Sequence, residues 1–444
     1  MKPIRMIPVL LSLLLLGGCT FPSGDDLLAA PGPSTNYQTL QAELDELIAS
    51  GVSYTAPIEG ENRSSIQLVD LDNDGVEEAI AFFRGSTSAT SNTFQIYVYK
   101  RQGDQYVAAG SVEGQGTAIQ SVDYPAITPD GRCGMVITWR LTGDGTGALT
   151  MCDFDAACTP GVLLETEYSA MELTDMTGDG ARDLLLITSN PAGQRVARLY
   201  QYNNASLDLL GEAATSPETV SVERMRSGRV QQTQYAVFAE ERMASGVGLT
   251  TDIFVYNNGT LVNLALDGED SITRSTYRPI SVYATDINSD GITELPRAVL
   301  MAGYSDAAGS DAIFMIDWYV YSADRPPVAV ATTYENISDN WRLSIDQAWY
   351  DRITAVKTTD SGLSAVAFYE YTGDGQQIPL FTIYCATGST REYYAGRSDL
   401  TQLGETAQAV YFVRMADEAQ QSTLEINAAD IENRFSLVKQ DWNN

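Results

Sequence analysis

The sequence predicts an all-β fold built from repeated four-stranded units, and three observations support this prediction. Between positions 65 and 335 the chain consists mostly of short apolar or alternating runs bounded by turn residues, a pattern typical of β-strands. Acidic loops of one form recur between such runs. They begin at Asp70, Asp175 and Asp286, which are 105 and 111 residues apart. Half of that spacing, about 50 residues, is the size of one four-stranded propeller blade.

We therefore expect an all-β propeller of about five four-stranded blades over residues 52–337, with a small C-terminal α+β domain after it. Radial repetition leaves no long exposed sheet edge, which favours closure of the ring. Residues 52–55 could supply an extra strand that joins the first and last blades, and the fifth blade is expected to begin with a strand at 279–285. A parallel β-helix with calcium repeats is the alternative, but its repeats would be far shorter.

The acidic loops carry oxygen-bearing side chains at loop positions 1, 3, 5 and 9 and a glycine at position 6. Ca²⁺ requires six or more oxygen ligands at short range, and the glycine allows the backbone to aim the position 7 carbonyl at the ion. A neutral residue at position 3 should weaken binding in the second and third loops. The predicted calcium ligands are Asp70, Asp72, Asp74, the Val76 carbonyl and Glu78; Asp175, Thr177, Asp179, the Ala181 carbonyl and Asp183; and Asp286, Asn288, Asp290, the Ile292 carbonyl and Glu294.

Two other interpretations of the loops compete with this one. An EF-hand needs a bidentate Glu at position 12 and a helix on each side. Position 12 is Ala81, Leu186 and Arg297, and the flanking runs have the pattern of strands. The second alternative is an Asx-rich turn that needs no ion, because Asp-Gly is a common turn pair. Recurrence with the same flanks favours up to three structural Ca²⁺ sites.

The units between the acidic loops keep the strands but lack the ligand set. Position 3 is Pro125 in the second unit and Met225 in the fourth. Turns are expected at Asp130-Gly131 and at Ser227-Gly228.

The loops and the blade period together resemble the FG-GAP/VCBS-type propeller repeat, best known from integrin α-subunit heads. The resemblance covers roughly 270 residues and implies that the loop residues named above hold calcium within a propeller. The chain lacks a clear Phe-Gly and Gly-Ala-Pro signature, and the integrin head has more blades.

The N-terminus predicts export and lipid anchoring. Residues 1–18 combine a short basic region with an apolar core, as in a secretory signal peptide, and Leu16-Gly17-Gly18-Cys19 resembles the bacterial lipobox. That resemblance implies lipidation of Cys19 and attachment to the extracytoplasmic side of the cell membrane. Residues 19–35 would form a flexible tether, and residues 36–51 a helix that packs on the propeller.

The C-terminal segment, residues 338–444, changes character. A new set of strands is expected to open at Trp341–Ile345, and a helix is expected from Ala428 to Trp442 with Asn427 as its N-cap. Thr372-Gly-Asp-Gly375 is interpreted as a hairpin turn.

Composition limits the possible functions. The net charge of −31, and −33 once Lys2 and Arg5 are removed, disfavours binding to nucleic acid and to anionic lipid headgroups. The chain contains no histidine, which excludes Ser-His-Asp and Cys-His catalysis and His-based metal sites. Cys152 and Cys158 could form a disulfide or remain two buried thiols.

These observations favour a non-enzymatic module at the cell surface that binds an unknown extracellular protein or glycan, or that scaffolds an envelope complex. Its ligand-binding face would be built from inter-strand loops such as Arg84–Asn92 and Met301–Asp311. The alternative is a carbohydrate-active enzyme that uses carboxylates in the propeller funnel, a chemistry that needs no histidine.

Overall fold

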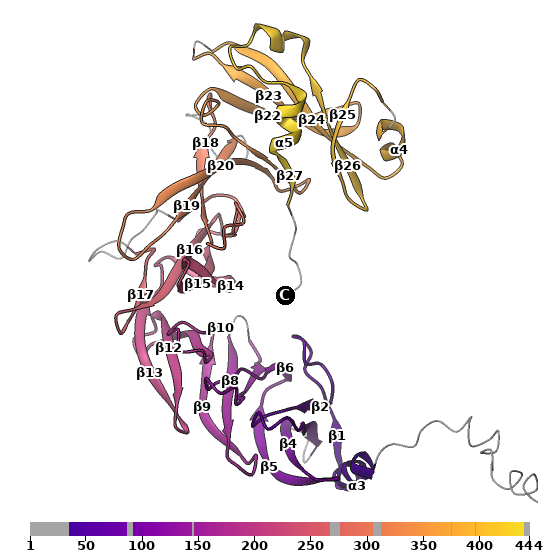
Figure 1. Cartoon of the computed structure of the whole chain (residues 1–444), viewed down its shortest axis with the longest axis vertical. Coiled ribbons are helices and arrows are strands. Elements are labelled where there is room, and N and C mark those ends of the chain that lie inside the picture. Colours follow the sequence, from indigo (N-terminus) through magenta and orange to yellow (C-terminus); the bar gives the residue numbers. More distant parts are fainter. Residues whose placement is uncertain are drawn as a thin grey trace, which may run out of the picture.

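The computed structural model describes residues 35–86, 92–143, 146–266, 276–304, 312–373, 375–395 and 397–438 (Figure 1). The predicted signal peptide, Cys19 and almost all of the tether lie outside these residues. Within the described segments, no helix combines the length and the apolar character needed to cross a membrane.

The predicted N-terminal helix is confirmed as α3, Thr35–Ala49. Its buried face is formed by Leu40 and Leu44, which are 4% and 1% exposed and pack against the first sheet. Gly51 follows the helix with a φ of 103°, a left-handed conformation that favours glycine and ends the helix.

The first sheet shows that residues 52–55 do not close a ring. Val52 pairs with Gly85 and Tyr54 with Phe83, so the predicted closing strand lies in the first sheet. Strand β3 is therefore flanked on one side by both β1 and β2, and on the other by β4. The strands of this sheet are β1 (Val52–Tyr54), β2 (Ile66–Val69), β3 (Glu78–Ser86), β4 (Asn92–Gln102) and β5 (Gln105–Gln115).

The second and third sheets each contain four antiparallel strands in sequence order, as expected for the repeated unit. Their strands are β6 (Ala118–Asp123), β7 (Met135–Arg140), β8 (Gly147–Phe154) and β9 (Pro160–Tyr168), followed by β10 (Ala170–Thr174), β11 (Asp183–Ser189), β12 (Arg195–Asn203) and β13 (Ser206–Ala214).

The fourth sheet corrects one predicted turn. Ser227 and Gly228 lie inside a long strand and pair with Val237 and Ala236, and the turn falls at residues 232–233 instead. A continuous run of cross-strand pairs overrides the local turn preference of Ser-Gly here. The strands are β14 (Thr219–Gln231), β15 (Gln234–Met243), β16 (Leu249–Asn257) and β17 (Thr260–Asn263).

The fifth sheet departs most from the prediction. The expected first strand at 279–285 is reduced to one bridge, Thr285 with Glu294. The segment at Trp341 does not open a new strand set, because it pairs with the preceding strand of this sheet. The strands are β18 (Leu295–Leu300), β19 (Phe314–Val320), β20 (Val328–Asn336), β21 (Trp341–Ser344) and β27 (Phe435–Leu437).

A sixth sheet and three short helical segments complete the described chain. The predicted helix at 428–442 is shorter: it ends at Arg434, and the next residues join the fifth sheet as β27, where Phe435 pairs with Leu343. Asn427 caps this helix as predicted, in a capping box with Asp430. The elements are β22 (Ile353–Asp360), β23 (Leu363–Tyr371), β24 (Gln377–Thr387), α4 (Thr390–Ala395), β25 (Thr401–Glu405), β26 (Ala409–Met415), the 3₁₀-helix η2 (Asp417–Gln421) and α5 (Ala428–Arg434).

The turn predicted at 372–375 joins β23 and β24, which pair antiparallel. The residue at position 374 is outside the described segments.

Shared apolar cores hold successive sheets together. Phe82 and Phe94 of the first sheet pack with Trp139 of the second, and Tyr334 of the fifth sheet packs with Phe368 of the sixth. Figure 1 shows the sheets following one another along a curved path, with the first and last sheets at separate ends of it. The described part of the chain is thus an all-β succession of antiparallel sheets.

Candidate calcium loops

The three acidic loops adopt one backbone conformation. Position 6, the expected glycine, has a φ of 85°, 92° and 85° in the three loops. Position 4 is also left-handed, with φ values of 58°, 79° and 61°, a feature that the sequence did not predict. Asn and Gly tolerate this region well, whereas Ser does so less readily. The position 4 residues are Asn73, Gly178 and Ser289.

The carboxylate at position 1 organises each loop in the same way. In the first loop, Asp70 Oδ1 accepts a hydrogen bond from the amide of Asp74 at 3.1 Å, and Asp70 Oδ2 accepts one from Gly75 at 2.9 Å. Asp175 and Asp286 accept the equivalent bonds in the second and third loops. The loop is therefore held partly by its own amides, as in an Asx turn.

The carboxylate at position 9 is buried in every loop because it lies where the second strand of the hairpin begins. Glu78, Asp183 and Glu294 are 0%, 1% and 0% exposed. Each accepts a hydrogen bond from the amide at position 2, at distances of 3.1, 2.8 and 2.9 Å. Burial raises the pKa of Glu78, that of Asp183 to about 6 and that of Glu294 to about 7.

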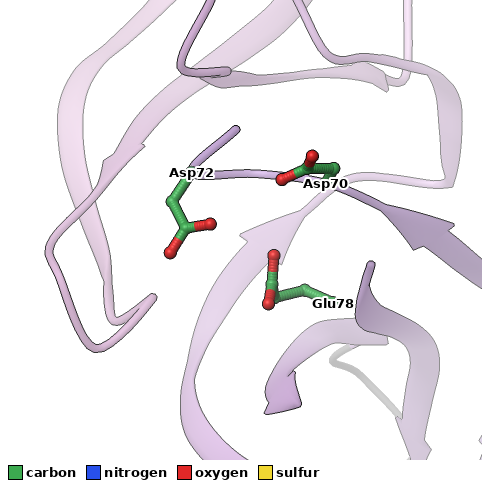
Figure 2. A group of neighbouring side chains, drawn as sticks. All are labelled: Asp70, Asp72 and Glu78. Carbon is green, nitrogen blue, oxygen red and sulfur yellow. The ribbon is translucent and has the colours of Figure 1, made fainter. Parts of the chain in front are cut away.

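The first loop brings three carboxylates together. Asp70, Asp72 and Glu78 each place an oxygen within 4.8 Å of the others, and Figure 2 shows these groups converging between the end of β2 and the start of β3. Asp72 Oδ1 and Glu78 Oε1 are buried and have no hydrogen-bond partner among the described residues. Asp74 is not part of this group, and its Oδ1 accepts a bond from the amide of Val76 at 2.8 Å.

A lysine reaches the first loop from strand β4. Lys100 Nζ lies 2.8 Å from Asp72 Oδ2 and donates a second hydrogen bond to the Ala156 carbonyl at 2.9 Å. The bond to Asp72 raises the pKa of Lys100 to about 12, so the side chain is charged at neutral pH. Lys100 was not among the site residues predicted from the sequence, although it follows Tyr99 just as Gln201 follows Tyr200.

The second loop has glutamine where the first has lysine. Gln201 Nε2 donates to Thr177 Oγ1 at 3.1 Å and to Asp179 Oδ2 at 2.8 Å. Asp183 Oδ2 accepts amide hydrogen bonds from Met176 and Thr177, but Asp183 Oδ1 is buried without a partner in the described part of the chain.

The third loop satisfies its own polar groups. Asn288 Nδ2 donates to Asp290 Oδ2 at 3.0 Å and to Glu294 Oε1 at 3.4 Å. The position 3 side chain therefore takes up acceptors that a cation would otherwise use.

Each loop is also bonded to an adjacent sheet. Asn73 donates to the Asp130 carbonyl at 2.6 Å, and the Arg182 amide donates to the Ala126 carbonyl at 2.7 Å, so the first two loops both contact the connection between β6 and β7 of the second sheet. The Thr293 amide of the third loop donates to the Arg229 carbonyl of the fourth sheet at 2.8 Å.

Of the three acidic loops, the first has the side chains that best fit a hard cation. A buried carboxylate oxygen without a partner costs free energy unless a proton or a metal neutralises it. Asp70, Asp72 and Glu78 are the residues that could hold Ca²⁺ there, because oxygen is the ligand atom it prefers. Only one oxygen of this kind occurs in the second loop, and the described atoms of the third loop have none.

The cysteines are free thiols in the described structure, so Cys152 and Cys158 form two buried thiols. The Cys158 thiol donates to Asp72 Oδ2 at 3.8 Å. Burial raises the pKa of Cys158 to about 11 and that of Cys152 to about 12, and both groups stay protonated at neutral pH.

Three other buried carboxylates lie in the fourth sheet: Glu240 and Glu241, which are each paired with an arginine, and Asp252, which accepts hydrogen bonds from Ser216. Glu240 pairs with Arg278, which is 0% exposed. Glu241 lies 2.7 Å from Arg195, and burial raises the pKa of Glu241 to about 8. Because all three residues are at most 2% exposed, they do not form an open pair of carboxylates of the kind that glycoside hydrolysis needs.

Comparisons with known proteins give no family assignment. No family model matches the chain, and no curated protein matches it. Among solved structures, the Dos1 propeller covers 81% of this chain with 88% of its own length, at 10% identity and a TM-score of 0.25. Sqt1 of Saccharomyces cerevisiae covers 76% with 92% of its own length, at 10% identity and a TM-score of 0.23. A protein assigned as a 6-phosphogluconolactonase, from Bacteroides fragilis, covers 78% with 92% of its own length, at 9% identity and a TM-score of 0.25.

Proposed function

We propose that this chain is a lipid-anchored, extracytoplasmic β-propeller-type protein that uses calcium to stiffen its sheets and acts as a non-enzymatic ligand-binding or scaffolding module. The observation that carries the calcium proposal is that buried carboxylate oxygens at Asp72, Glu78 and Asp183 have no described partner. The repetition of one loop conformation three times supports it.

Calcium would act here through stability. It would neutralise clustered carboxylates, and each loop is hydrogen-bonded to a neighbouring sheet, so fixing a loop would also fix the junction between two sheets. A junction fixed in this way would keep the loops of neighbouring sheets in constant relative positions, so that together they could bind an extracellular protein or glycan. Cys19 would keep the module on the membrane, because two or three acyl chains suffice for stable anchoring.

Thermal unfolding of the full chain in detergent tests the calcium proposal. A ligand that binds only the folded state adds about 2.7 kcal/mol per site when its free concentration is a hundred times its Kd. We expect a higher Tm in calcium than in EGTA, and a smaller shift with magnesium, which demands stricter octahedral geometry. An identical melting curve in calcium and EGTA would refute calcium binding.

The module's partner requires a separate assay. We expect the full chain to retain an extracellular protein or a glycan from an array in calcium and to release it in EGTA. Retention that is unchanged by EGTA would contradict the idea that calcium holds the binding surface in register.

A further inference from the structure

The first loop has the largest number of acidic ligands, yet a lysine already occupies one of them. Lys100 Nζ lies 2.8 Å from Asp72 Oδ2, and the two side chains are 18% and 19% exposed. The negative charge of Asp72, at loop position 3, is therefore balanced by the ammonium group of Lys100.

The register of the sheets places the same strand position beside every loop. Tyr99 pairs with Ala79, Tyr200 with Leu184 and Tyr319 with Leu295. The residue after each tyrosine therefore lies next to the carboxylate at loop position 9. These residues are Lys100, Gln201 and Val320.

The three residues differ in charge, and this decides how they interact with a divalent ion. An ammonium group near a Ca²⁺ site repels the ion, and at about 4 Å the repulsion is appreciable even in a well-screened protein environment. Asp72 must therefore either release Lys100, or bind the ion through one oxygen while Lys100 stays on the other. The amide of Gln201 also donates to two predicted ligands, Thr177 and Asp179, but it carries no charge that repels the ion, and the side chain of Val320 is apolar.

We propose that Lys100 is a built-in competitor for the metal in the first loop, which makes this loop a low-affinity site that responds to changes in calcium, in spite of its additional carboxylate. The inference rests on the proposed calcium binding and concerns the order of the calcium affinities of the three loops. Exchange of the ammonium for the ion would also break the bond from Lys100 to the Ala156 carbonyl, so occupancy of the first loop would alter the turn after β8 in the second sheet.

A reciprocal exchange of the two side chains tests this role. Lys100→Gln gives the first loop the residue of the second, and Gln201→Lys does the reverse. The first loop is isolated by Asp179→Asn and Asp290→Asn, which remove charge from the other loops but keep an oxygen to accept the amide bonds to Ala181 and Ile292. Calcium binding by the full chain in detergent is then measured by titration calorimetry, with the melting temperature in EGTA as the measure of folding.

In the isolated first loop we expect Lys100→Gln to lower the Kd for calcium by on the order of tenfold. Gln201→Lys should raise the Kd of the second loop by a similar factor in a chain that carries Asp72→Asn and Asp290→Asn, since Asp72 belongs to the carboxylate group of the first loop. Weaker calcium binding after Lys100→Gln would overturn the inference, because it would mean that Lys100 positions Asp72 for the ion. An unchanged Kd would overturn it as well.

The two proposals fail in distinguishable ways. If the unaltered chain binds no calcium, the proposed function itself is wrong. If that chain binds calcium but the exchanged variants keep their affinities, only the competitor role of Lys100 is wrong. Lys100→Met provides a second variant if the glutamine exchange lowers the melting temperature in EGTA.

Discussion

Replacing Asp183 with asparagine should stabilise the protein when calcium is absent. The carboxylate is 1% exposed, and its Oδ1 has no partner among the described residues. Burial raises the pKa of Asp183 from 3.8 to about 6. At 1.36 kcal/mol per pKa unit, the ionised side chain costs the folded state roughly 3 kcal/mol as an upper bound. The asparagine side chain would keep an oxygen for the amides of Met176 and Thr177 without the charge.

The sign of the pH dependence follows from the same shift. Because the pKa of Asp183 is higher in the folded state, its destabilising contribution is absent below about pH 4 and grows as the pH rises to about 6. The free energy of unfolding in EGTA should therefore fall between these values more steeply for the unaltered protein than for Asp183→Asn. The difference between the two curves isolates this one group.

The assay is denaturant unfolding of both proteins in EGTA and in calcium, at several pH values. We expect Asp183→Asn to be the more stable protein in EGTA at pH values well above the folded-state pKa and to gain less stability from calcium. A variant that is less stable than the unaltered protein in EGTA would refute the argument that this carboxylate is buried without a counterion.

Three further predictions concern packing and local geometry. Asn73→Ala should cost about 1 kcal/mol, because it places alanine at a φ of 58° and removes the bond to the Asp130 carbonyl; Asn73→Gly, measured by the same unfolding curves, should cost less. Gly114→Ala should lower stability by roughly 1–3 kcal/mol, since a Cβ there would lie 2.0 Å from the Trp139 ring; a neutral effect in thermal melts would contradict this contact. Asn427→Ala should cost roughly 0.5–2 kcal/mol by loss of the capping box of α5, whereas Asn427→Ser should be close to neutral in the same measurement.

The sequence predicted the loops and most strands because both have a local signal. Loop positions 1, 6 and 9 repeat in the residues themselves, and the structure gives them the same bonds in every copy. The left-handed residue at position 4 has no comparable signal, because Asn73, Gly178 and Ser289 share only a small or polar side chain.

The features that the sequence missed depend on contacts between distant residues. Nothing local shows that Lys100 approaches Asp72, because that contact follows from the register of β3 and β4. Strand β27 was missed for a similar reason. Phe435 continues the apolar spacing of the preceding helix, so the local pattern predicts that the helix goes on. Phe435 leaves the helix because pairing with Leu343 and packing against Trp341 outweigh one more helical turn.

The return of the last strand to the fifth sheet imposes an order on biogenesis. Phe435–Leu437 covers the edge of β21, and the Val438 amide donates to the Asn340 carbonyl, but about 90 residues separate the two partners along the chain. A chain that emerges from its N-terminus must therefore hold the β21 edge unpaired until Leu437 has been made. An interrupted translation product would expose that edge to other chains, so incomplete copies should be selectively prone to aggregation and proteolysis.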